Sequence, residues 1–264
     1  MRRWWFEIRA RWLGTLGERA LEAGRYAAAE QLVQAALALA QSASRSDDIL
    51  TMTLLNQLGM IHKYQGRYLD GRRAYRRGLE LARRRLGAEH ATIAAFYHNL
   101  GGLEHARGRH ARGEPFARRA VAIRERVLGA SHPDVACDLA ALAAILDGRK
   151  RHQEAESIHR RALTLFRRHL GTDHRDIAAA LGNLAACLYS QGRTADAMPI
   201  AEQAQGMSAR VLGASHPDTA VAAANLAVIR RRGAEVSPDA SAARASGETS
   251  QPAFVAIDPW SAMS

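Results

Sequence analysis

The chain has 264 residues, of which 47% are hydrophobic and 24% are charged, so it can bury a substantial core. Its 37 Lys and Arg against 26 Asp and Glu give a formal net charge of +11, which would suit an acidic partner, a nucleic acid or an anionic surface. No stretch of the sequence approaches the ~18 uncharged apolar residues of a membrane span. The N-terminus is basic, but charged residues interrupt the segment that would be an apolar run in a secretory signal. We therefore expect a cytoplasmic protein with no transmembrane segment.

The first twelve residues are rich in aromatic and basic side chains. Trp4, Trp5, Phe6 and Trp12 stand among four arginines. Such a mixture can mark a helix at a membrane surface. Here it runs directly into a repeated pattern, so we expect this segment to cover the exposed end of a stack of repeats.

A Leu-Gly pair followed three residues later by histidine recurs with a period of 42 residues. The leucines of the pairs are Leu86, Leu128, Leu170 and Leu212, and the histidines are His90, His132, His174 and His216. A fixed period of this size is typical of stacked units that cannot bury their apolar faces alone and share one core. The sequence therefore predicts an elongated tandem-repeat protein.

Each unit has the pattern of two helices joined by a short turn. Glycine marks the end of the first helix in most units, because it adopts the left-handed backbone conformation at no steric cost. The five positions hold Gly24, Gly66, Gly108, Lys150 and Gly192. In the third unit the second helix is predicted over residues 110–128, ending at Gly129. Pro133 and Asp134 then suit the first turn of the next helix.

Small residues recur beside a column of leucines and predict close contact between the two helices of a unit. One such column holds Gly17, Gly59, Gly101, Ala143, Ala185 and Ala227. A second column includes Gly78, Ala120, Ala162 and Ala204. The two cysteines, Cys137 and Cys187, lie at unrelated repeat positions, and we expect both to be reduced thiols that pack like small hydrophobic side chains.

The combination of Leu-Gly with small residues, Gly-Arg-Tyr at 66–68 and Arg-Ala at 119–120 resembles the tetratricopeptide repeat. The linker phrase Leu-Gly-Ala-Ser-His-Pro-Asp at 128–134 and 212–218 is similar to the long repeats of kinesin light chains and their bacterial relatives. The resemblance implies an all-α, right-handed α-solenoid of about five helical hairpins with a C-terminal capping helix, over residues 1–232.

Beyond residue 232 the composition changes to Ala, Ser, Gly, Pro and acidic residues. Residues 233–251 have too few apolar side chains to offset the cost of ordering, so we expect a disordered tail over 233–264. Within it, residues 252–260 have the pattern of a short linear ligand. One hypothesis is that Phe254 to Trp260 docks back onto the solenoid and competes with an external ligand, helped by the high effective concentration of a tethered segment.

Catalytic and metal-binding motifs are not found. There is no phosphate-binding Gly-Lys-Ser/Thr, no Cys-x-x-Cys, no His-Glu-x-x-His and no Gly-x-Ser-x-Gly. The four repeated histidines belong to different units, whose spacing of at least 8–10 Å between packed helices is too wide for one metal ion. We predict that each histidine orders the turn between two units, and we expect no enzyme activity, no cofactor and no metal.

The first helix of each unit is expected to line the inner groove of the solenoid. The predicted peptide-binding residues are Asn56, Gln57, Met60, Lys63, His98, Asn99, His105, Asn183, Tyr189 and Asn225. The resemblance implies that the amide column of Gln57, Asn99, Asn183 and Asn225 contacts the backbone of a bound peptide. The alternative is that these amides bond to the neighbouring helix and only stabilise stacking. Lys63 would favour an acidic ligand.

The predicted function is therefore a protein–protein interaction scaffold that holds a peptide or a partner helix. Arginines recur on the second helices in two columns that begin at Arg77 and Arg84. An alternative function is therefore a basic scaffold that binds nucleic acid or an anionic surface. We favour solvated side chains paired with nearby glutamates as the explanation of these columns, so nucleic acid is not the expected partner. A third possibility is an auxiliary or sensor subunit of an enzyme or signalling assembly.

Overall fold

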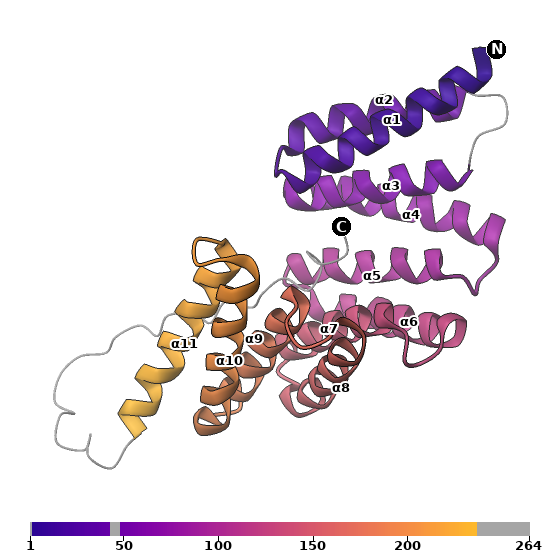
Figure 1. The fold of residues 1–264 in the computed structure, drawn as a ribbon. Helices are drawn as coiled ribbons and strands as arrows, with labels where there is room; N and C mark the ends of the chain where they lie inside the picture. Colours follow the sequence, from indigo (N-terminus) through magenta and orange to yellow (C-terminus); the bar gives the residue numbers. More distant parts are fainter. Residues whose placement is uncertain (1, 43–47, 237–264) are drawn as a thin grey trace. The chain divides into compact units, whose positions relative to one another are not determined.

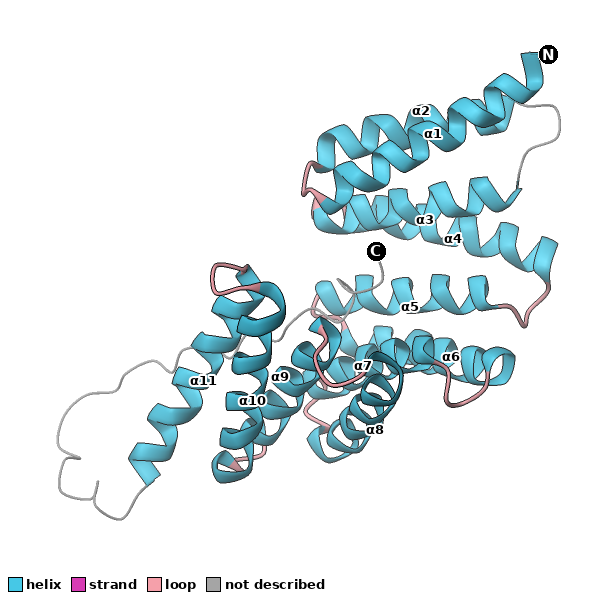
Figure 2. Ribbon diagram, viewed as in Figure 1, coloured by secondary structure: helices cyan, strands magenta, loops and turns pink. Residues whose placement is uncertain are grey.

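The computed structural model describes residues 2–42 and 48–236, and throughout these ranges the regular secondary structure is helical (Figures 1 and 2). The helices are α1 (Arg2–Glu22), α2 (Tyr26–Ser42), α3 (Asp48–Tyr64), α4 (Tyr68–Leu86), α5 (Ala91–Ala106), α6 (His110–Leu128), α7 (Pro133–Gly148), α8 (His152–Leu170), α9 (Arg175–Ser190), α10 (Thr194–Leu212) and α11 (Pro217–Val236). None of these helices is both long enough and apolar enough to cross a membrane.

The helices form hairpins in two compact units. The unit of residues 2–130 holds α1–α2, α3–α4 and α5–α6, and the unit of residues 131–236 holds α7–α8, α9–α10 and the single helix α11 (Figure 1). Within each unit every hairpin packs on the next. This confirms the predicted all-α architecture of stacked hairpins followed by a last helix. The predicted tail motif at 252–260 lies outside the described residues.

The N-terminal aromatic segment belongs to α1, the first helix of the first hairpin. Trp5, Ile8 and Trp12 follow one another at i, i+3 and i+7 and are all exposed. The segment is therefore part of the first hairpin, and the side chains of Trp5 and Trp12 lie on an exposed face of the helix.

The turns have the predicted chemistry. The four glycines that end first helices have φ between 67° and 78°, and Lys150 adopts the same left-handed conformation with φ 61°. In the four turns that precede α5, α7, α9 and α11, histidine caps the following helix by accepting a hydrogen bond at Nδ1 from the amide two residues later. These bonds link His90 to Thr92, His132 to Asp134, His174 to Asp176 and His216 to Asp218, at 3.1–3.2 Å. The predicted structural role of the repeated histidines is confirmed.

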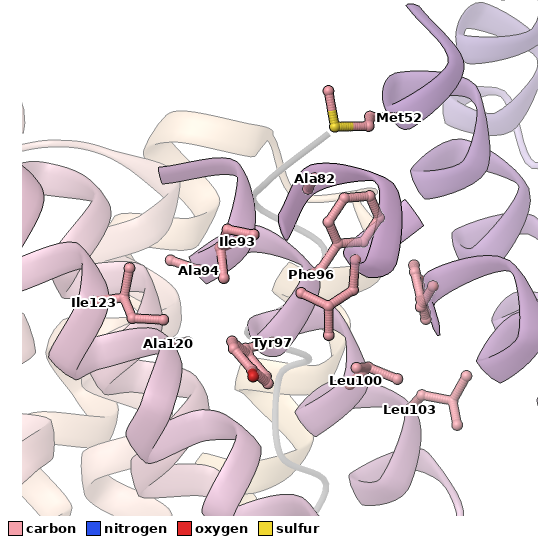
Figure 3. Close-up of a cluster of buried hydrophobic side chains, with 12 residues drawn as sticks. Met52, Ala82, Ile93, Ala94, Phe96, Tyr97, Leu100, Leu103, Ala120 and Ile123 are labelled. Atoms are coloured by element: carbon pink, nitrogen blue, oxygen red, sulfur yellow. The ribbon is translucent and has the colours of Figure 1, made fainter. Parts of the chain in front are cut away.

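Close helix contacts depend on the small residues of the repeat. Gly59 lies against the ring of Tyr75, and Gly78 lies against the ring of Phe96, so closely that a methyl group at either glycine would overlap the ring. Phe96 belongs to a buried cluster that also includes Met52 and Leu100 (Figure 3). The glycines therefore set how deeply the aromatic side chains enter the core.

We predict that Gly59→Ala lowers the free energy of unfolding by about 1–3 kcal/mol, because the added methyl group overpacks the contact with Tyr75. Gly206→Ala in α10 is the matched control, since its Cβ would meet only Arg210 at 3.6 Å. There alanine should stabilise the helix by about 0.5–1 kcal/mol. Urea unfolding followed by circular dichroism measures both changes. Two changes of the same sign would contradict the packing argument.

A polar clamp joins adjacent hairpins at two places. Glu30 on α2 accepts hydrogen bonds from Gln65 at 3.0 Å and from Arg67 at 2.7 Å, both in the turn of the next hairpin. The equivalent contacts recur 126 residues later, where Glu156 accepts from Gln191 at 3.0 Å and Arg193 at 2.7 Å. Three repeats separate the two copies, and Arg72 and Met198 occupy the position of the glutamate in two other repeats, so the clamp is made by some repeats and not by all.

The clamp changes the acidity of its carboxylate. Burial opposes ionisation of Glu30, but hydrogen bonds from Gln65, Arg67 and His62 outweigh it and lower the pKa of Glu30 from 4.5 to about 2. Because the folded pKa lies below the unfolded value, the ionised carboxylate stabilises the fold above pH 4.5. That contribution is lost as pH falls from 4.5 towards 2.

Glu30→Gln should therefore destabilise the protein by about 1–2 kcal/mol at pH 7, where charge-assisted hydrogen bonds are lost. The difference from the unsubstituted chain should shrink as the carboxyl protonates below pH 4.5. Urea unfolding at a series of pH values from 7 to about 3.5 tests the trend. A difference that stays constant over this range would show that the clamp does not depend on the charge of Glu30.

Candidate functional site

An apolar pocket of about 260 Å³ lies between the first halves of α3 and α5. Its lining residues are Ile49, Met52, Thr53 and Asn56 from α3, Leu86 at the end of α4, His90 from the connection to α5, and Thr92, Ala95 and Phe96 from α5. Met52 and Phe96 are buried and belong to the core cluster of Figure 3, so the floor of the pocket is rigid. Apolar pockets of this kind with a few polar groups at the edge are typical ligand sites.

The pocket opens onto one face of α3. Ile49, Thr53, Asn56, Met60 and Lys63 follow at i, i+4, i+7, i+11 and i+14, a spacing that places them along one side of the helix. Ile49 is 69% exposed although its side chain is apolar. The predicted row of Asn56, Met60 and Lys63 therefore extends two turns towards the helix N-terminus. Extending the same spacing backwards along the sequence would have found Thr53 and Ile49.

Two predicted amides meet across neighbouring helices. Asn99 on α5 donates a hydrogen bond from Nδ2 to Oδ1 of Asn56 on α3 at 2.7 Å. Asn56 in turn points its Nδ2 at the sulfur of Met60, at 3.9 Å. An amide side chain offers two donors and a carbonyl oxygen, so each asparagine retains further hydrogen-bonding capacity after making this bond. The contact joins the first helices of two hairpins.

The other predicted residues of this unit are buried or partly buried. Gln57 and His98 are buried within the helix packing. His105 is partly buried, and its ring packs edge-on against His110 with 4.9 Å between ring centroids. Lys63 lies 5.1 Å above the ring of Tyr64, which fixes the ammonium group near the end of α3.

The predicted residues of the second unit lie on α9 and α11. Asn183 and Asn225 are buried, and Tyr189 is partly buried. The structure therefore brings Asn56, Asn99 and Met60 together at one surface, whereas the amides of α9 and α11 lie in the interior of their own unit. Repeat position alone could not distinguish these cases, because burial depends on the neighbouring side chains.

The arginine columns of the second helices are largely exposed and partly paired with acids. Arg126 contacts Glu89, and 84 residues later Arg210 contacts Asp173 at 2.7 Å, so both reach back to the preceding turn. Arg84 pairs with Glu80 at 3.5 Å along its own helix. This arrangement agrees with solvated side chains paired with acids, one of the two readings of these columns.

A family model described as the tetratricopeptide repeat matches residues 50–112, 92–168, 142–209 and 176–235, which together span most of the chain. The chain is a tetratricopeptide repeat protein. The matched segments overlap and cover successive hairpins of the structure. A search of curated proteins gave no match.

Solved structures resemble this tetratricopeptide repeat protein in fold. BtubC (BKLC) from P. vanneervenii is 21% identical with a TM-score of 0.68, over 80% of this chain and 84% of that chain. A structure of nearly identical kinesin-light-chain TPR-like repeats from Podosopora anserina is 20% identical with a TM-score of 0.63, over 77% of this chain and 97% of that chain. The predicted likeness to kinesin light chain repeats is confirmed at the level of fold.

The hydrogen bond between Asn56 and Asn99 should stabilise the stacking of two hairpins. We predict that Asn56→Ala and Asn99→Ala each lower the free energy of unfolding, and that a double-mutant cycle gives a coupling of about 0.5–1.5 kcal/mol. Urea unfolding of the two single variants and the double variant measures it. Strictly additive losses would mean that the two amides do not stabilise each other.

Proposed function

We propose that the chain is an interaction scaffold that binds an extended peptide of a partner protein along α3 and α5. The observation that carries this proposal is the apolar pocket between these helices, with exposed Ile49 at its edge and a polar row continuing along α3. A peptide could bury one apolar side chain in the pocket. Membership of the tetratricopeptide family, whose repeats serve as interaction scaffolds, supports the same reading.

The amides beside the pocket suit a peptide main chain. Asn56 and Asn99 use one donor and one acceptor in their mutual bond, and their remaining groups can bond to backbone amides and carbonyls of any sequence. The pocket would then select the side chain. Stabilising the stacking of helices and contacting a peptide are compatible roles for Asn56 and Asn99. Their mutual hydrogen bond orders the two amides, and their remaining donors and acceptors can bond to the peptide backbone.

An acidic residue on the ligand would strengthen binding. Lys63 lies at the end of the row that begins at the pocket, and the chain carries a formal net charge of +11. Charge complementarity of this kind increases association rates and selects among partners. We therefore propose a ligand with an apolar side chain followed, along α3, by an acidic one.

A peptide selected from a phage-displayed library on the immobilised full-length chain provides a probe, and fluorescence anisotropy gives its Kd. Ile49→Ala should weaken binding about 5–30-fold through lost apolar contact. Lys63→Glu should weaken an acidic peptide about tenfold.

Two matched controls lie on α4. Leu69 is the second residue of its helix, as Ile49 is of α3, and it is 62% exposed, so Leu69→Ala removes similar apolar surface elsewhere. Arg76→Glu makes the same charge change as Lys63→Glu on an exposed position. Both controls should bind within about twofold of the unsubstituted chain, and equal losses in variants and controls would refute the site.

The proposed docking of Phe254 to Trp260 can be tested with the same probe. A chain ending at Val236 keeps all of α11 and removes this segment. If the segment competes for the pocket, the shortened chain should bind the peptide more tightly, because a tethered competitor has a high effective concentration. Equal affinity would show that the segment does not occupy this site.

A further inference from the structure

Four side chains with metal-binding or proton-carrying groups meet inside the second unit. Asp147 ends α7, His152 and His159 lie on α8, and Cys187 lies on α9. The two oxygens of Asp147 lie 3.0 Å from Nδ1 of His152 and 2.9 Å from Nε2 of His159. Donor atoms of Asp147, His152 and Cys187 all lie within 4.8 Å of one another.

This cluster interrupts a pattern that most other repeats keep. The position of Cys187 is occupied by exposed Arg19 in the first hairpin and elsewhere by fully buried aliphatic residues, namely Ile61, Leu103, Ile145 and Ile229. The position of His159 is occupied elsewhere by buried apolar residues, namely Val33, Tyr75, Ala117 and Ala201. Cys187 and His159 are also buried, and both lie beside the carboxylate of Asp147. A buried polar group costs stability unless it is compensated, so two such changes at one place indicate a shared purpose.

We propose that Asp147, His152 and Cys187 form a binding site for a divalent transition metal ion, with Zn²⁺ as the metal that best fits the donors. A thiolate, an imidazole and a carboxylate are the three ligand types that Zn²⁺ takes in proteins. Thiolate disfavours Mg²⁺ and Ca²⁺, which prefer oxygen ligands. This site was not foreseen from the repeated histidines, because its ligands come from three helices of two hairpins.

The observed spacing suits such an ion. With metal–ligand bonds of about 2.0–2.3 Å, the donor atoms of a tetrahedral site lie about 3.3–3.6 Å apart. The present separations, none above 4.8 Å, differ from these by little more than about 1 Å, which side-chain rotation can supply. The ion would bind Nδ1 of a neutral His152 whose ring proton is on Nε2, and the Cys187 thiol would lose its proton to solvent as it becomes a thiolate ligand. His159 would remain on the second oxygen of Asp147 and hold that carboxylate in position.

An open pocket adjoins the cluster and leaves room for a fourth ligand. It has a volume of about 530 Å³ and is lined by Lys150, Arg151, His152, Gln153, Glu154 and Gln191. Gln191 lies 3.6 Å from the sulfur of Cys187, so the pocket reaches the cluster itself. Three protein ligands with an open fourth position is the arrangement of zinc sites that admit water or an external ligand.

The test uses the full-length chain without an affinity tag, reduced and stripped of metal with chelator. Co²⁺ is the probe, because a cysteine ligand gives a thiolate-to-cobalt charge-transfer band and tetrahedral coordination gives intense visible bands. We expect both bands to saturate at one Co²⁺ per chain and to disappear when Zn²⁺ is added. A chain that shows no charge-transfer band would overturn the proposal.

The repeats supply variants that should fold. Cys187→Ile restores the residue that three other repeats carry at this position, and His152→Tyr restores the residue found at Tyr26 and Tyr68. Cys187→Ile should abolish the charge-transfer band, and His152→Tyr should weaken Co²⁺ binding at least about tenfold. Both variants should keep the helical circular dichroism spectrum of the unsubstituted chain.

Cys137→Ala is the matched control, since it removes the other thiol of the chain and should leave the cobalt spectrum unchanged. Loss of the band in this control, or its persistence in Cys187→Ile, would place the ion elsewhere and refute the site. A histidine–aspartate cluster that serves packing alone predicts no cobalt band in any of the four proteins. The spectra thus separate a metal site from a purely structural cluster.

Discussion

The fold depends on close contact between helices, both within a hairpin and between neighbouring hairpins, because a single helical pair cannot bury its apolar face alone. Glycines and alanines at fixed repeat positions permit this contact, and the large side chains opposite them fill the space that they leave. Gly59 on α3 meets Tyr75 within one hairpin, and Gly78 on α4 meets Phe96 on α5 of the next hairpin. The histidine caps then fix where each new hairpin begins.

The period of 42 residues predicts the architecture well because it repeats several independent signals at once. Leu-Gly pairs, helix-ending glycines and the prolines at 133 and 217 mark boundaries that the structure reproduces. Backbone geometry is local, so sequence spacing is sufficient to predict it. Lys150 shows the limit of this reasoning, since it adopts the left-handed conformation of the glycines that it replaces.

The candidate site was predicted less completely, because a residue's exposure depends on its neighbours. Asn99 lies beside Asn56 near the surface, whereas Asn183 and Asn225 share the repeat column of Asn99 but are buried. Ile49 was not predicted because the predicted row on this helix began at Asn56 and left out the two turns before it. The cluster around Asp147 was missed for a different reason, since its members differ from the repeat and no period reveals them.

Lys150 has a consequence for local motion. A residue with a side chain at φ 61° pays an energetic cost that the glycines at the equivalent turns avoid. The turn between α7 and α8 is therefore held by its surroundings more than by its own backbone preference. Such a segment opens with less free energy than its counterparts, and a ligand at the neighbouring His152 would slow the exchange of its amide hydrogens with solvent.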